Sequence, residues 1–297
     1  MDQIHLMKVF VAVGELESFA AAARRLDISA AAVTRAVSAL EAARAGKKVA
    51  LISSGDAGVY GMAGPTYEVL FQSGWTPDDE VQVEIIPGAS ALNSCAALVG
   101  APLTHDFCAI SLSDLLTPWP TIARRLDAVA MADFVVALYN PKSGRRTRQI
   151  VEAQRLFLRH RRPDTPVAIV KSAYRRRENI VFTTLDSMAE ADIGMLSTVL
   201  IGNSNTFIRN GLMVTPRGYA NKYDMQDGGA TREGERAGRS LSTGLLGWLD
   251  NLAAEHAAGD SIETLAARYR LPADYIQSTL DEPWEAPSAV PSEESEA

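Results

Sequence analysis

A series of short apolar runs begins at Val49 and constrains the fold of this chain more than any other feature. The runs are rich in β-branched residues, and helical or glycine- and proline-rich stretches separate them. This alternation is typical of an α/β protein, and we expect two sheets. The predicted strands are residues 49–54, 81–87, 134–140, 166–173, 179–185, 197–203 and 212–217.

Composition narrows the class of protein. The net charge of −7 over 297 residues argues against a general nucleic-acid coat, although the first segment is locally basic. Cys95 and Cys108 are the only cysteines, so we expect neither a disulfide framework nor a metal site. No apolar run approaches the roughly 20 residues of a membrane span, and the N-terminus does not read as a signal peptide. We therefore expect a cytoplasmic protein with no membrane contact.

The two ends of the chain differ from its middle. Apolar residues recur at helical spacing in residues 1–43, which predicts a short all-α segment. Residues 224–240 are polar and glycine-rich, as in a linker. Residues 241–281 predict a helical extension, whose turn at Leu271-Pro272 fits a small packing helix pair better than a DNA-reading one. The acidic tail, residues 282–297, is predicted to be disordered.

The glycine-rich sequence SSGDAGVYGMA, residues 53–63, directly follows the first predicted strand. Gly55, Gly58 and Gly61 allow the backbone to turn tightly and to approach a ligand, and α/β proteins commonly bind ligands at such strand ends. On spacing alone, a strand-to-helix turn without a ligand explains the loop equally well.

A second segment, residues 85–119, brings Pro87-Gly88, a helix with small side chains and a polar loop close together in sequence. The loop carries His105, Asp106, Ser111, Ser113 and Asp114. Small side chains leave room for a cofactor beside the backbone.

Together with ALYNPKSGRR, VKSAYRRRENIVFTTL and IGNSNTF, these motifs make residues 44–223 closely resemble the tetrapyrrole methylases, in particular those that methylate carbon 17 of precorrin-3B with ring contraction. The resemblance implies two α/β domains. The turn-rich stretch PKSGRRTR predicts their boundary near Pro141, which gives residues 44–140 and 141–223. The resemblance also implies S-adenosyl-L-methionine between the domains, a precorrin-type tetrapyrrole above it, and a homodimer.

The same resemblance implies which residues contact the cofactor. It places the glycine loop, and the start of the helix that follows Pro87-Gly88, at the methionine portion of the cofactor. It places three later residues at the adenosine portion. The residues implied are Gly55, Asp56, Gly58, Val59, Tyr60, Ser90, Ala91, Tyr139, Asn140 and Ala173. Ala57 stands where the family usually has proline, which should loosen the loop.

The catalytic residues are unknown at this level. Methyl transfer from a sulfonium needs an electron-rich carbon in line with the methyl group, so positioning can supply most of the catalysis. If a polar group assists, His105, Asp106 and Asp114 are the candidates, yet each could equally cap a helix or brace the fold. The arginine runs at 145–148 and 175–177 could meet substrate carboxylates or simply form a solvated face.

The first segment departs from the family pattern, because no Gly-Pro-Gly loop precedes Val49 and the first domain is therefore expected to be incomplete. Residues 1–41 instead resemble the opening of a LysR-type regulator, a helix-turn-helix fragment without its wing and dimerising helix. Two alternatives follow. The chain could be a DNA-binding regulator with a methylase-like sensor portion, although the missing wing and dimerising helix argue against autonomous promoter binding. Alternatively, it could be an inactive truncated remnant.

Overall fold

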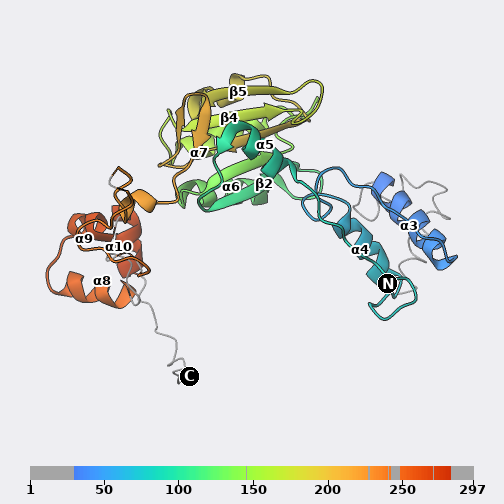
Figure 1. Cartoon of the computed structure of the whole chain (residues 1–297), viewed down its shortest axis with the longest axis horizontal. Coiled ribbons are helices and arrows are strands. Elements are labelled where there is room, and N and C mark those ends of the chain that lie inside the picture. Colours follow the sequence, from blue (N-terminus) through green and yellow to red (C-terminus); the bar gives the residue numbers. More distant parts are fainter. Residues whose placement is uncertain are drawn as a thin grey trace. The chain divides into compact units, whose positions relative to one another are not determined.

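The computed structural model of this protein describes residues 30–281, except Arg145, Asp227, Ser240, residues 242–247 and Arg270, and only the backbone of residues 30–33. It divides into two units, residues 1–217 and 218–297, which are described separately (Figure 1). The predicted helix-turn-helix lies largely, and the predicted acidic tail entirely, outside the described residues.

The first unit is built on a five-stranded mixed sheet with strand order β2-β3-β6-β4-β5. β2 and β3 run parallel, and β6 runs antiparallel to both β3 and β4, so β2, β3 and β4 all end at the same edge of the sheet. The strands are β2 (Phe107–Ser111), β3 (Val135–Tyr139), β4 (Pro166–Lys171), β5 (Asn179–Thr184) and β6 (Ser197–Ile201).

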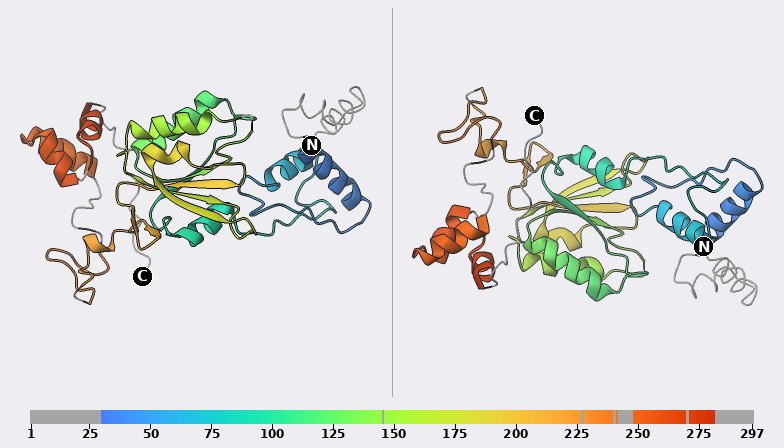
Figure 2. Two further views of the ribbon diagram at one scale, coloured as in Figure 1. Left: turned by 90° about the horizontal axis from the view of Figure 1, so that it is seen from above. Right: turned by 90° about the horizontal axis from the view of Figure 1, so that it is seen from below.

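Helices cover both faces of this sheet (Figure 2). Alternate residues of the central strands face opposite sides, as the pleat requires, and pack in two hydrophobic clusters. Val136 and Leu138 face α6 and α7, whereas Ala137 between them faces α5. Among its described residues, the helices of this unit are α3 (Ala30–Arg44), α4 (Ala63–Gln72), α5 (Ala91–Val99), α6 (Trp119–Met131), α7 (Gln149–Leu158) and the 3-10 helix η1 (Leu185–Glu190).

A three-stranded sheet, ordered β1-β8-β7, completes the first unit. It consists of β1 (Gly100–Ala101), β7 (Phe207–Arg209) and β8 (Leu212–Val214). β7 and β8 form a hairpin whose turn, Asn210-Gly211, has both residues in the left-handed conformation. Met213 of β8 is fully buried in the same cluster as α5, which anchors this small sheet.

α3 and α4 form a packed pair. Ala36, Val37 and Leu40 of α3 are buried against Val69 and Leu70 of α4. The helix predicted at the end of the first segment is therefore confirmed, and its apolar face is occupied by α4.

The structure corrects two expectations about this unit. The boundary expected near Pro141 divides the five-stranded sheet, since β2 and β3 precede it and β4, β5 and β6 follow. Residues 49–54 and 81–87 do not form strands. Ile52 and Ile86 there are 82% and 67% exposed, because neither segment has a neighbouring strand among the described residues to pair with.

The second unit contains the 3-10 helix η2 (Tyr219–Asn221), α8 (Trp248–Ala257), α9 (Ile262–Tyr269) and α10 (Ala273–Asp281). Leu252, Leu265 and Ile276, one from each α-helix, form its buried core. The predicted helical extension is thus a small three-helix cluster. Within the described residues, no helix is both long and apolar enough to cross a membrane.

Candidate functional site

The ends of β2, β3 and β4 bring several predicted site residues to one edge of the sheet. Tyr139 ends β3 and Asn140 follows it, Ser111 lies opposite Tyr139 on β2, and Ala173 follows β4. Tyr139 and Ala173 both pack against the cluster that holds α5. The carboxyl ends of parallel strands are where open α/β sheets commonly bind ligands.

Asp56 ties the glycine loop to the turn at Pro87-Gly88. Its Oδ1 accepts hydrogen bonds from the N–H groups of Gly58 (2.8 Å) and Val59 (3.1 Å), and its Oδ2 accepts one from Gly88 N–H (2.9 Å). These bonds, with Gly88 first and Gly58 next, hold the pKa of Asp56 below its ordinary value. The sequence singles out Pro87-Gly88 but does not indicate the partner of Gly88, which comes from a segment 32 residues away.

Two glycines make this connection sterically feasible. A Cβ on Gly88 would lie 2.3 Å from the carbonyl oxygen of Gly55, so the two backbones meet where no side chain fits. Gly55 itself has a φ of +75°, which L side chains rarely adopt. The structure thus shows a close approach of the loop to another segment of the chain, whereas the predicted approach to a ligand stays a prediction.

Two tyrosines join the glycine loop to the strand ends. The ring centroids of Tyr60 and Tyr139 are 4.9 Å apart, and Tyr60 Oη donates to the carbonyl of Ala109 in β2 (3.1 Å). Tyr139 Oη accepts from the N–H of Leu92 in the first turn of α5 (2.7 Å). Beside it, buried Ser90 caps α5 by accepting from Asn93 N–H. Ala91, the first residue of α5, therefore lies between two groups that fix the helix start.

Left-handed backbone conformations concentrate at this edge. Tyr60, Asn140, Ser172 and Tyr174 have φ values between 48° and 56° although none is glycine. This conformation costs free energy in a non-glycine residue, and residues that adopt it tend to cluster at binding and catalytic sites. Ala173 lies between the last two of them.

A polar network adjoins Asn140. Its Nδ2 donates to Ser111 Oγ (3.0 Å), and its carbonyl accepts from Arg146 Nη2 (2.9 Å). Arg146 Nη1 also donates to Ser113 Oγ (3.3 Å). Nearby, the carboxylate of Asp114 accepts from Gln149 Nε2 (2.8 Å). The structure thus gives Arg146 and Asp114 bracing roles at the strand ends, and the sequence offered no signal for Gln149.

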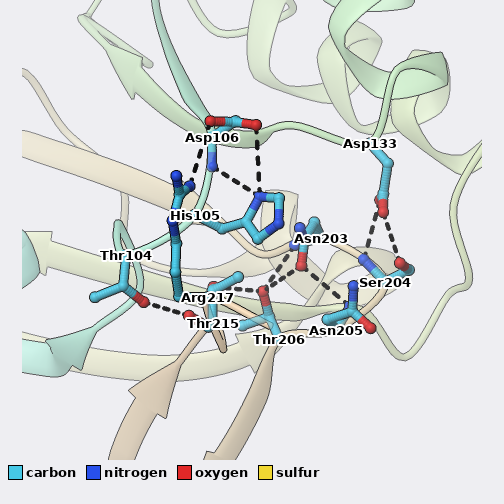
Figure 3. Close-up of polar contacts among 10 residues, drawn as sticks. All are labelled: Thr104, His105, Asp106, Asp133, Asn203, Ser204, Asn205, Thr206, Thr215 and Arg217. Atoms are coloured by element: carbon cyan, nitrogen blue, oxygen red, sulfur yellow. Dashed lines mark hydrogen bonds and ion pairs between the residues drawn. The ribbon is translucent and has the colours of Figure 1, made fainter. Parts of the chain in front are cut away.

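His105 and Asp106 lie at the other end of β2 (Figure 3). His105 Nδ1 accepts from the N–H of Asp106 (2.8 Å), and the Asp106 carboxylate lies 3.6 Å from Arg217. At about 3.3 Å per residue, β2 separates them from Ser111 by roughly 15–20 Å. The structure therefore does not bring these two candidates to the edge where Tyr139 and Asn140 lie.

Next to His105, the motif IGNSNTF forms a turn in which Ser204 and Asn205 are exposed and the flanking residues Asn203 and Thr206 are buried (Figure 3). Thr206 Oγ1 accepts from Asn203 N–H (2.8 Å) and shares a hydrogen bond with Thr215 Oγ1 (2.7 Å). All three side chains are buried, which makes the motif a structural connection between β6 and β8. Among the described residues, no group of His, Cys, Asp or Glu side chains has the arrangement of a metal site.

Comparison with known proteins gives a consistent result. A model of the tetrapyrrole (corrin/porphyrin) methylases matches residues 6–189. That match begins inside the segment predicted to be a helix-turn-helix fragment, which remains a prediction where it lies outside the described residues.

Two curated relatives are similar to this chain, and the two matches cover nearly the same number of its residues. A cobalt-factor III methyltransferase from Priestia megaterium is 63% identical over 193 residues, 65% of this chain and 36% of that protein. A probable cobalt-factor III C(17)-methyltransferase from Salmonella typhimurium is 48% identical over 187 residues, 63% of this chain and 76% of that protein. The chain therefore spans about a third of the first relative and about three quarters of the second.

Among solved structures, the crystal structure of the methyltransferase CobJ is similar with a TM-score of 0.57 and 34% sequence identity. The similarity covers 62% of this chain and 76% of that one. It agrees with the mixed α/β architecture predicted from the sequence.

Proposed function

The chain belongs to the tetrapyrrole (corrin/porphyrin) methylase family, and we propose that it is an S-adenosylmethionine-dependent methyltransferase of corrin biosynthesis. The observation that carries this proposal is the connection of the glycine loop, through Asp56–Gly88 and Tyr60–Tyr139, to the ends of β2 and β3. An enzyme that works by positioning must hold its binding residues in a fixed geometry, and these contacts do so for the glycine loop.

Tetrapyrrole methylases use S-adenosylmethionine, and the residues present fit that molecule. Val59, Tyr60 and Tyr174 leave 37%, 55% and 67% of their surfaces exposed beside the strand ends, and a ligand with apolar surface would cover them. We assign the methionine portion to residues Gly55 to Tyr60 with Ser90 and Ala91. We assign the adenosine portion to Tyr139, Asn140 and Ala173.

We propose that the substrate is a precorrin-type macrocycle methylated at carbon 17 with ring contraction. The relatives' names favour cobalt-factor III, which contains cobalt, and the sequence resemblance favours precorrin-3B, which does not. Parallel turnover assays with the two macrocycles separate these possibilities.

The bound cofactor supplies a methyl group on an electrophilic sulfonium. The chain's own residues act by placement. Asp56 holds the glycine loop through backbone N–H groups, and the Tyr139 hydroxyl orients the first turn of α5. Holding the glycine loop and orienting α5 require no proton acceptor. The proposal therefore assigns no residue as a dedicated base.

The test is isothermal titration of the full chain with S-adenosylhomocysteine and S-adenosylmethionine. We expect micromolar binding that Asp56→Asn weakens about tenfold or more, because an amide cannot accept all three N–H bonds as the carboxylate does. Asp79→Asn is the matched control, since Asp79 accepts a single N–H bond from Thr76 in a turn outside the site.

Absence of binding by the wild-type chain would contradict the enzyme proposal and favour the truncated-remnant alternative. Equal losses for the two variants would contradict the assigned role of Asp56. A mobility-shift assay at low salt, with no DNA retained, would remove the regulator alternative.

We also propose a cytoplasmic homodimer, following the family resemblance. Light scattering should give twice the 32.0 kDa mass of one chain. A mass of one chain at micromolar concentration would contradict the dimer.

A further inference from the structure

The loop that joins β4 to β5, residues 172–178, rises from the same sheet edge as the proposed cofactor site. β4 and β5 form a hairpin whose last pair is Lys171 and Asn179. Arg175 N–H donates to the carbonyl of Ser172, and Glu178 N–H donates to the carbonyl of Arg175, both at 2.9 Å. These bonds, with the left-handed residues Ser172 and Tyr174, give this arginine loop a defined shape.

The arginine loop borders a cavity of about 350 Å³. Its lining consists of Ser172, Arg175, Arg176, Arg177 and Leu196. This volume lies at the small end of the range for ligand pockets, roughly 300–1,000 Å³, so it suits one edge of a large ligand better than the whole of it.

The positive charge of this cavity is not neutralised within the described part of the chain. The carboxylates nearest in sequence are engaged elsewhere: Glu178 Oε2 accepts from Tyr174 N–H (2.6 Å), and Asp192 pairs with Lys171 (2.6 Å). No ion pair between described residues involves Arg175, Arg176 or Arg177. Three adjacent guanidinium groups beside a cavity favour a ligand that carries several anionic groups.

Apolar surface adjoins these charges. Tyr174, Met195 and Leu196 are each more than half exposed. On the other side, Arg175 Nη2 lies 3.4 Å from Ser54 Oγ, so the arginine loop touches the glycine loop directly. A ligand held here would therefore have an apolar body, an anionic rim and one edge next to the cofactor residues.

We propose that the arginine loop binds the peripheral carboxylates of the tetrapyrrole substrate, with Arg176 and Arg177 as the principal cations and Arg175 as the link to the glycine loop. This inference rests on the proposed function, since a tetrapyrrole acid has the required flat apolar body and carboxylate rim. It assigns substrate recognition to a hairpin that is separate in sequence from the glycine loop.

The test uses uroporphyrin III, a tetrapyrrole with eight carboxylates, and coproporphyrin III, which has four. Binding is followed by quenching of porphyrin fluorescence on titration with the full chain. We expect Arg176→Gln/Arg177→Gln to weaken uroporphyrin binding about tenfold or more and coproporphyrin binding less, while S-adenosylhomocysteine affinity stays within about twofold. Added salt should reduce the wild-type affinity and narrow the difference between the two proteins.

The control variant, Arg155→Gln/Arg159→Gln, removes the same charge from exposed positions at α7. If it weakens uroporphyrin binding as much as the loop variant does, a general charge effect explains the result and the inference is wrong. Wild-type chain that binds S-adenosylhomocysteine but not uroporphyrin also overturns it, and leaves the proposed methyl-donor site intact. Wild-type chain that binds neither molecule overturns the proposed function as well.

Discussion

The carboxylate of Asp56 accepts a hydrogen bond from the backbone N–H of Gly88, 2.9 Å away in space and 32 residues away in sequence. The bond is stronger to the ionised carboxylate, and together with the bond from Gly58 it holds the pKa of Asp56 below its ordinary value. A depressed folded-state pKa means that the stabilisation is present above the unfolded value and is lost only as pH falls through the folded value.

Asp56 should therefore cause no change in S-adenosylhomocysteine affinity between about pH 5 and pH 8, because it stays ionised throughout that range. Titrations across the range with the wild-type chain and with Asp56→Asn check this. An affinity step in the wild type that vanishes in Asp56→Asn would mean that Asp56 titrates there, contrary to expectation.

Gly88→Ala should destabilise the protein by about 1–3 kcal/mol, because the new Cβ would lie 2.3 Å from Gly55 O and the backbone must shift. Gly64→Ala is the control. Gly64 lies in the first turn of α4 with open space around it, so alanine there should stabilise by up to about 1 kcal/mol. Denaturant unfolding of both variants measures the contrast, and similar free energies for the two would contradict the close approach.

Tyr139→Phe should cost about 1–3 kcal/mol, since it leaves the N–H of Leu92 without its acceptor beside a buried helix start. Tyr60→Phe removes a hydroxyl from an exposed side chain, where water can replace it at the Ala109 carbonyl, and should cost about 0.5 kcal/mol or less. Thermal unfolding of both variants tests whether Tyr139→Phe loses more stability than Tyr60→Phe. A larger loss for Tyr60→Phe would reverse the assigned roles.

Arg161→Lys should cost about 3 kcal/mol. The buried guanidinium donates to the carbonyls of Val129, Ala130, Phe134 and Gly202, and a lysine ammonium cannot reproduce that planar set. Burial lowers its pKa to about 10, so it remains charged at neutral pH. Arg159→Lys, at an exposed pair with Asp127, should change stability by less than about 1 kcal/mol in the same unfolding assay.

His105→Ala should leave S-adenosylhomocysteine affinity and methyl transfer within about threefold of wild type, because β2 separates His105 from the strand ends by roughly 15–20 Å. A single-turnover methylation assay provides the measurement. Loss of turnover with unchanged affinity and unchanged unfolding would restore His105 as a catalytic candidate.

Local sequence patterns predicted much of the fold. The apolar runs at 134–140, 166–173, 179–185, 197–203 and 212–217 all contain strands, because they are rich in β-branched residues and are bounded by turns. The runs at 49–54 and 81–87 have the same composition but form no strand, since a strand requires a neighbour and composition does not report one. β2 was missed because Phe107 to Ser111 lies inside a segment read as a polar loop.

The candidate site likewise has features that the sequence predicts and features that it does not. The sequence by itself determined the turn-forming glycines and the residue types of the strand ends, because both depend on local backbone geometry. Only the tertiary structure decided that Asp56 meets Gly88, that Tyr60 meets Tyr139, and that His105 lies apart from them. Those relationships depend on strand order and direction, which arise from long-range pairing that no local pattern encodes.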